Sequence, residues 1–235
     1  LDKSCLQGAI WPQGAGLRRW LRHKKSWAKE LNFEKRNGGA YGGHYHNLGG
    51  FMLDKTEFYI NGSWVPSQDG HSFPVLNPAT EDAFATITLG GAKDAEAAIA
   101  AAKAAFPEWS MTSPVDRAGY LQKLLDVYIA RNDEMGATIS TEMGAPIDMA
   151  VSDQAGSGIS HLKAFIRALG TMEFQRPLRQ GVEGQDIAFE AAGVAALITP
   201  WNWPMNQVVL KVGAALAAGC TMVLKPSEIA PMSSI

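Results

Sequence analysis

Two short runs of the sequence carry the residue types best suited to chemistry. They are Leu197-Ile198-Thr199-Pro200-Trp201-Asn202-Trp203-Pro204 and Leu224-Lys225-Pro226-Ser227-Glu228. Asn202 stands between prolines that restrict the backbone, so its side-chain amide can be held in place as a hydrogen-bond donor. Lys225 offers a cation, and Glu228 offers a carboxylate in the same run. Together these groups predict a site for a polar ligand.

The two runs must be positioned by the elements around them. Residues 194–199 are predicted to form a strand, residues 205–218 a helix closed by Gly219, and residues 221–224 a short buried strand. This order is one βαβ unit over residues 194–225, the building block of nucleotide-binding sheets. Because ligands bind at the carboxyl ends of parallel strands, both runs are expected at one edge of the sheet.

The residues before this unit predict a hairpin followed by helices. Asn61-Gly62 favours a tight turn between strands 57–60 and 63–65, and Ser113-Pro114-Val115-Asp116 favours a capped helix start. The other predicted elements are extended segments at 74–78 and 84–89, helices at 94–106, 132–143 and 146–169, and a strand at 187–190. The pattern indicates an α/β protein.

Several chemistries lack their usual sequence signals. The sequence has no Gly-x-Gly-x-x-Gly, His-Glu-x-x-His or Cys-x-x-Cys pattern, so neither the common dinucleotide fingerprint nor a metal site is predicted. No apolar run approaches the roughly eighteen residues of a membrane span. The only cysteines, Cys5 and Cys220, are too few for a disulfide framework, so a reducing, cytoplasmic location is expected.

Six motifs in order resemble those of the NAD(P)-dependent aldehyde dehydrogenase superfamily. They are Tyr59-Ile60-Asn61-Gly62, Asn77-Pro78-Ala79-Thr80, Thr141-Glu142-Met143-Gly144-Ala145-Pro146, Ile198-Thr199-Pro200-Trp201-Asn202, Ala215-Leu216-Ala217-Ala218-Gly219 and Val223-Leu224-Lys225-Pro226-Ser227-Glu228. The resemblance covers residues 52–235 and only the N-terminal portion of the family's chain. It implies an aldehyde dehydrogenase-like fold with N-terminal helices, a hairpin and a partial Rossmann-type cofactor domain.

The resemblance also implies roles for individual residues. Asn202 matches the side-chain donor of the oxyanion hole, which stabilises the oxygen of a tetrahedral thiohemiacetal. Lys225 and Glu228 match residues that hydrogen-bond the adenosine ribose hydroxyls. A carboxylate suits a free 2′-hydroxyl and repels a 2′-phosphate, so Glu228 favours NAD over NADP. The remaining residues expected to contact the cofactor are Ile198, Thr199, Pro200, Trp201 and Ser227.

The family's reaction needs a cysteine thiolate and a glutamate base, and in the family both lie downstream of the Lys-Pro-Ser-Glu motif. Cys220 follows the helix-ending Gly219 and is expected to be a small buried residue. Cys5 lies outside the resemblance. The full-length form is therefore expected to oxidise an aldehyde to a carboxylate, while this chain, as an N-terminal fragment, is expected to be inactive alone.

Other interpretations remain open at this stage. In the family, strands like those at about 176–190 form an oligomerisation extension, so a homo-oligomer is expected, and a non-catalytic fragment that binds intact subunits is an alternative. A further alternative is a relative of the family that passes its acyl group to coenzyme A. The identity of the aldehyde is not indicated, and neither a membrane nor a nucleic acid is the expected partner.

The first 51 residues differ from the rest. They hold nine Lys or Arg against three acids, a net +6, while the remainder carries −8. A transit peptide, a basic arm for nucleic acid and non-native upstream sequence are three explanations. The third is preferred, because Met52-Leu53-Asp54-Lys55 resembles a start, and the segment is expected to be disordered.

Overall fold

The computed structural model describes residues 53–181 and 184–235. The predictions for residues 1–51 lie outside this part of the chain. The strands are β1 (Leu53–Lys55), β2 (Glu57–Ile60), β3 (Ser63–Pro66), β4 (His71–Leu76), β5 (Ala83–Leu89), β6 (Gln175–Pro177), β7 (Asp186–Ala188), β8 (Val194–Ile198) and β9 (Thr221–Lys225). The helices are α3 (Ala92–Ser110), α4 (Pro114–Ala130), α5 (Asn132–Met143), α6 (Ile147–Met149), the π-helix η1 (Ala150–Ala155), α7 (Gly156–Thr171), α8 (Pro204–Ala217) and the 3-10 helix η2 (Met232–Ser234).

The predicted hairpin is present. β2 pairs antiparallel with β3, and Ile60 lies opposite Ser63 across the turn. Asn61 and Gly62 both adopt positive φ, 51° and 78°, as a two-residue hairpin turn requires. A second sheet has the order β1-β5-β4, in which β5 is parallel to β1 and antiparallel to β4.

One helix begins, and a second both begins and ends, where the sequence predicts. At the start of α4 the Ser113 hydroxyl accepts a hydrogen bond from the Asp116 N–H at 3.1 Å, and Pro114 occupies the first turn. α5 covers Asn132–Met143 as predicted and ends at Gly144, whose φ of 78° closes the helix. Both predictions rest on local chemistry, so packing elsewhere does not override them.

Two other helix predictions need correction. α3 was expected to end at Phe106, yet it continues through Pro107 to Ser110. Trp109 is buried on this last turn, so packing outweighs the hydrogen bond that a proline removes. The helix expected over 146–169 is instead three consecutive segments, because a π-helical turn with one extra residue separates α6 from α7.

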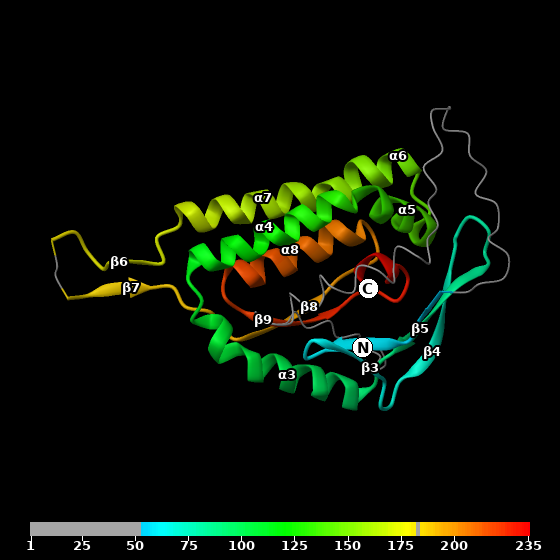
Figure 1. Cartoon of the computed structure of the whole chain (residues 1–235), viewed down its shortest axis with the longest axis horizontal. Helices are drawn as coiled ribbons and strands as arrows, with labels where there is room; N and C mark the ends of the chain where they lie inside the picture. The colour runs from blue at the N-terminus through cyan, green and yellow to red at the C-terminus, as the bar shows by residue number, and fades with distance from the viewer. Residues whose placement is uncertain (1–52, 182–183) are drawn as a thin grey trace.

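The predicted βαβ unit forms the centre of the molecule. β8 pairs in parallel with β9, and α8 connects them. Figure 1 shows α4, α7 and α8 on one side of this pair and α3 on the other. Val223 of β9 packs with Ala98 and Ala102 of α3, and Met222 and Leu224 join the larger core on the helical side. The α/β fold with N-terminal helices and hairpin is confirmed.

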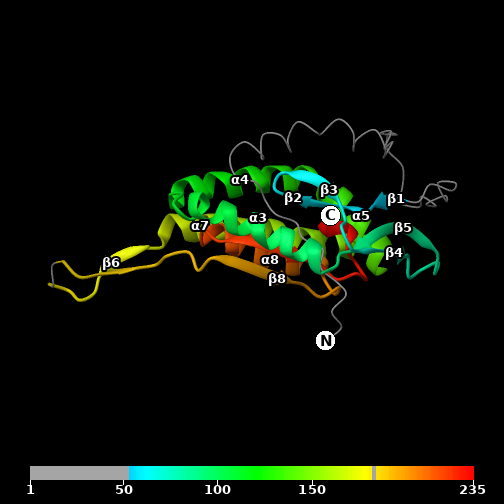
Figure 2. The same ribbon diagram turned by 90° about the horizontal axis from the view of Figure 1, so that it is seen from below.

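An arm made of β6 and β7 projects from this centre (Figures 1 and 2). Its two strands pair antiparallel from Gln175–Ala188 to Pro177–Asp186. At its root, the buried Arg117 guanidinium carbon lies 5.3 Å from the centroid of the Phe174 ring, and Arg117 Nη1 donates to the Thr112 carbonyl at 3.1 Å. Arg117 thereby joins α4 to the base of the arm.

Replacing Gly219 by alanine is expected to destabilise the fold by about 2–3 kcal/mol. Gly219 ends α8 with φ +79°, and an added Cβ would lie 2.6 Å from Arg117 Nη1 and 3.3 Å from Ala191 Cβ. Because Arg117 is buried, it cannot move aside cheaply. Urea unfolding of the two proteins measures the change in the free energy of unfolding.

Gly170→Ala is the matched control for this experiment. Gly170 lies in α7 with nothing within 4 Å of an added Cβ, so alanine is expected to leave stability unchanged or raise it. Equal stability of the Gly219 variant and the wild type would show that the turn tolerates a side chain.

Candidate functional site

The candidate site lies where β8 and β9 end together. Ile198, the last residue of β8, is the register partner of Lys225, the last residue of β9. One residue further, the Thr199 N–H donates to the Lys225 carbonyl at 3.2 Å. The two sequence runs therefore meet at the carboxyl edge of a parallel strand pair, as predicted.

A charged pair stands at this edge. Lys225 Nζ lies 2.9 Å from Glu228 Oε2, and the Lys225 side chain is the more buried of the two, at 16% exposed against 34%. The backbone N–H of Glu228 and the Lys225 ammonium hold the pKa of the Glu228 carboxyl below its usual range. The site thus presents an ionised carboxylate beside a cation at neutral pH.

Hydrogen bonds to buried side chains stabilise the turn that carries Glu228 and the residues after it. The Ser227 hydroxyl is buried and accepts a hydrogen bond from the Ile229 N–H at 3.2 Å. Further on, the Glu142 carboxylate of α5 accepts from the backbone N–H groups of Met232 at 2.5 Å and Ser233 at 3.0 Å. Burial raises the pKa of Glu142 to about 7, although the two backbone donors favour its ionised form.

The end of β8 and the turn after it are largely exposed. Thr199 is buried, while Ile198 is 65% and Trp201 is 50% exposed. Pro200 is exposed as well. Large apolar side chains left open beside a charged pair are suited to cover the rings of a ligand whose polar groups bind the charges.

Asn202 lies in the same turn and is exposed. Within the residues that the structure describes, no hydrogen bond engages its side-chain amide. The next residue, Trp203, caps α8 in a left-handed conformation with φ 58° and ψ 59°, and its carbonyl accepts from the Gln207 N–H at 3.1 Å. The amide therefore projects from a sharply bent turn between the prolines, free to donate to a ligand.

Cys220 is not placed to act as a nucleophile. It is free and buried, in the turn between α8 and β9. In the ranges 53–181 and 184–235, no group of three or more His, Cys, Asp or Glu side chains could hold a metal ion. Nor is any helix of these ranges both long enough and apolar enough to cross a membrane.

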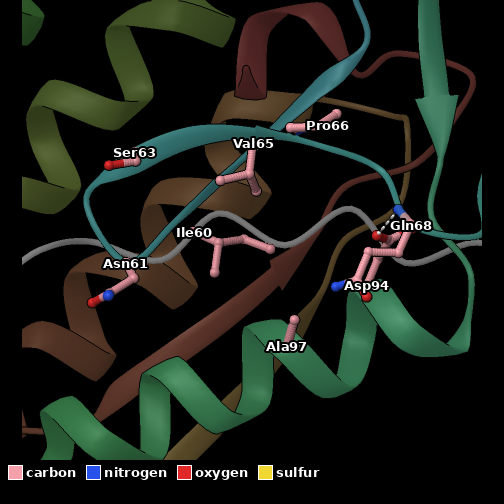
Figure 3. A pocket seen from close by; sticks show the side chains of 8 residues that line it. All are labelled: Ile60, Asn61, Ser63, Val65, Pro66, Gln68, Asp94 and Ala97. Carbon is pink, nitrogen blue, oxygen red and sulfur yellow. Dashed lines mark hydrogen bonds between the residues drawn. The ribbon is translucent and has the colours of Figure 1, made fainter.

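A separate cavity of ≈ 410 Å³ lies between the hairpin and the start of α3 (Figure 3). Its carboxylate is Asp94, which accepts from Ser67 Oγ at 2.6 Å and from the N–H groups of Gln68 at 2.8 Å and Gly91 at 3.1 Å. Burial opposes ionisation, but these bonds outweigh it and hold the pKa of Asp94 below its usual value. The Asp94 carboxylate therefore links the residues after the hairpin to the start of α3 through these hydrogen bonds.

Two residues near the site were not singled out from the sequence. His161 Nε2 of α7 lies 2.7 Å from Asn206 Oδ1 in the first turn of α8. Glu142 supports the end of the chain through η2. Glu142 had one available signal, since it lies one helical turn after the apolar Ile139 and so on the buried face of α5. The His161–Asn206 pair had none, because its members are far apart in sequence.

The fold and the site together define a class of protein. A βαβ unit with donors, a cation and a carboxylate at the carboxyl edge of its strands is the arrangement of an α/β protein that binds its ligand at that edge. The chain belongs to the aldehyde dehydrogenase family, whose profile matches residues 64–235.

Individual relatives agree with this assignment. The chain is 43% identical over 184 residues to a 3-succinoylsemialdehyde-pyridine dehydrogenase from a Pseudomonas species, covering 78% of this chain and 38% of that protein. Among solved structures, an aldehyde dehydrogenase from Bartonella henselae is 54% identical with a TM-score of 0.76, over 78% of this chain and 38% of the other. Aldehyde dehydrogenase C from Pseudomonas syringae, in complex with NAD⁺ and octanal, is 44% identical with a TM-score of 0.72, over 76% and 36%.

The chain thus spans 38% of the length of the curated relatives that it matches.

Proposed function

We propose that this chain supplies the oxyanion donor and the ribose-binding residues of an aldehyde dehydrogenase that oxidises an aldehyde to a carboxylate with NAD. The observation that supports it most is the register of β8 and β9, which joins the Asn202 turn to the Lys225–Glu228 pair. The aldehyde oxygen would accept a hydrogen bond from the Asn202 amide as it gains negative charge.

The residues at the strand edge fit a nicotinamide dinucleotide. Lys225 and Glu228 offer a donor and an acceptor for ribose hydroxyls, and Ile198 and Trp201 offer apolar cover for a base. When bound, the cofactor supplies the acceptor for hydride. Thr199 and Pro200 would contact it from the turn, while Ser227 is engaged with the Ile229 N–H and so fixes the turn that carries Glu228.

The nucleophile is proposed to come from sequence outside this chain. Buried Cys220 is an unsuitable thiolate, and Cys5 lies outside the described residues. By this proposal the 235 residues alone do not turn over aldehyde, and the protein at its native length does. The location is proposed to be cytoplasmic.

The β6–β7 arm is proposed to pair with another subunit in a homo-oligomer. All three residues of β6 are exposed, and the arm stands clear of the core (Figure 2). The same feature supports the second candidate function, a non-catalytic chain that associates with intact subunits. Co-purification of the 235-residue chain with a full-length relative tests that alternative, and failure to associate rejects it.

The direct test of the proposed function is the initial rate of aldehyde oxidation by the protein at its native length, with NAD and with NADP as separate cofactors. Formation of reduced cofactor in step with carboxylate is expected, faster with NAD. Absence of oxidation with either cofactor across aliphatic, aromatic and semialdehyde substrates would reject the proposal.

Replacing Glu228 by glutamine is expected to shift cofactor preference towards NADP. The ionised carboxylate repels a 2′-phosphate, and its removal also frees the Lys225 ammonium to bind that phosphate. We expect the ratio of kcat/KM with NADP to that with NAD to rise by about tenfold. The exposed Glu96 of α3 provides the control, because Glu96→Gln removes a carboxylate elsewhere. An unchanged ratio in the Glu228 variant would place the ribose elsewhere.

A further inference from the structure

Two neighbouring amides at the start of α8 both have their carbonyl oxygens occupied. An asparagine Oδ1 can only accept a hydrogen bond, so His161 Nε2 must donate to Asn206 across 2.7 Å. Beside it, Gln207 Oε1 accepts from Lys211 Nζ at 3.0 Å. Each amide is thereby oriented by a donor from another residue.

The NH₂ groups of these amides remain as free donors. In the part of the chain that the structure describes, neither NH₂ has a hydrogen-bond partner. Asn206, Gln207 and Lys211 thus form a donor strip, a surface that offers N–H groups and no free side-chain acceptor. A ligand beside it must bring acceptor atoms, because an apolar group would strip water from donors without replacing its hydrogen bonds.

The donor strip lies beside the candidate oxyanion donor. α8 turns Met205, Val208 and Val212 into the core, and Asn206 and Gln207 are half-buried outside that buried set. Asn202 occupies the turn that leads directly into this end of the helix. The start of α8 is therefore within a few residues of the proposed aldehyde site, where the chain of a substrate held by Asn202 could reach it.

We propose that the donor strip selects aldehydes that carry a second oxygen acceptor, a carbonyl or carboxylate, a few carbons from the aldehyde. Within this selection, His161 is a positioning residue that keeps the NH₂ of Asn206 turned towards the substrate. The inference rests on the proposed function, since it takes the Asn202 turn as the aldehyde site. A site built to hydrogen-bond a substrate group discriminates strongly against the analogue that lacks it.

The variant Asn206→Asp tests the donor strip while it preserves the hydrogen bond to His161 and the fold of α8. Aspartate has the same shape, still accepts from His161 Nε2, and is favourable near the N-terminus of a helix, so folding is preserved. It replaces the NH₂ donor by a carboxylate oxygen. The probes are succinic semialdehyde for the carboxylate, levulinaldehyde for the ketone and pentanal for the unsubstituted chain, each oxidised with NAD by the protein at its native length.

The wild type is expected to prefer both oxygenated probes to pentanal. In Asn206→Asp, kcat/KM for succinic semialdehyde should fall by about tenfold or more through a higher KM, with levulinaldehyde affected less and pentanal least of the three. His161→Leu should lower the same preference, and His161→Gln, which restores a donor, should recover it. Gln122→Leu removes an exposed amide of α4 and is the matched control.

The outcomes separate the two proposals. If the wild type oxidises all three probes and Asn206→Asp leaves their ratios unchanged, the donor strip is wrong while the proposed function stands. If the wild type oxidises pentanal and succinic semialdehyde with equal kcat/KM, the donor strip is also wrong and the proposed function still stands. If none of the probes is oxidised with NAD or NADP, the proposed function fails and this inference falls with it.

Discussion

Replacing Asn202 by alanine is expected to lower kcat for aldehyde oxidation by about 10²–10³-fold, roughly 3 kcal/mol of transition-state stabilisation. The exposed amide projects from the turn after β8, with no partner within the described residues, so a reacting oxygen can use its hydrogen bond fully. KM should change little, because the oxygen becomes a strong acceptor only as it gains charge. Steady-state kinetics of the protein at its native length measure both constants.

The control for this variant is the affinity for NAD, measured by equilibrium titration. It should be the same in Asn202→Ala and the wild type, because Lys225 and Glu228, the pair proposed to bind the ribose, are untouched. Asn202→Asp, which removes the donor and adds a negative charge, should be at least as slow as the alanine variant. A decrease in kcat of less than about threefold in both variants would remove Asn202 from the oxyanion site.

Stability is expected to fall as pH rises from about 5 to 7, and Glu142→Gln is expected to abolish this dependence. Glu142 is 1% exposed, and its pKa rises from 4.5 to about 7 because burial disfavours the charge. Its folded pKa exceeds the unfolded value, so its contribution is complete below 4.5 and is lost as pH approaches 7. The expected slope is about −1.4 kcal/mol per pH unit across this window, roughly 3 kcal/mol in all.

Urea unfolding at a series of pH values measures this slope. Glutamine keeps one carbonyl oxygen for the N–H groups of Met232 and Ser233 but does not titrate, so its profile should be flatter by the same slope. Glu108→Gln on the exposed side of α3 should retain the wild-type profile. Identical slopes in Glu142→Gln and the wild type would mean that Glu142 ionises normally in the folded protein.

Much of the fold could be predicted because local chemistry determines it. The Asn61-Gly62 turn, the Ser113 cap and the Gly144 stop depend on residues within one turn of the chain, and all three are confirmed. The strand-helix-strand order of the βαβ unit was equally readable, since Gly219 and the apolar run after it mark a helix end and a buried strand. These signals also placed both runs of site residues at one edge.

The parts that could not be predicted depend on contacts between distant residues. α3 continues past Pro107 because Trp109 on its last turn is buried in the core. Local sequence rules do not reveal that burial. The π-helical turn before α7 has no spacing signal, and the pairing of His161 with Asn206 joins separate helices. The roles of Asn202 and of the Lys225–Glu228 pair stay predictions, which the Asn202 and Glu228 variants test.

The left-handed conformation of Trp203 has a consequence for how this sequence can evolve. An aromatic residue with φ 58° costs about 1 kcal/mol or more relative to glycine, so the turn that presents Asn202 is held under strain. Glycine would relieve that cost and at the same time loosen the turn. Selection for stability alone therefore favours glycine at position 203, and selection for a fixed amide opposes it. Variants selected only for thermostability are therefore expected to carry glycine at position 203 and to oxidise aldehyde more slowly.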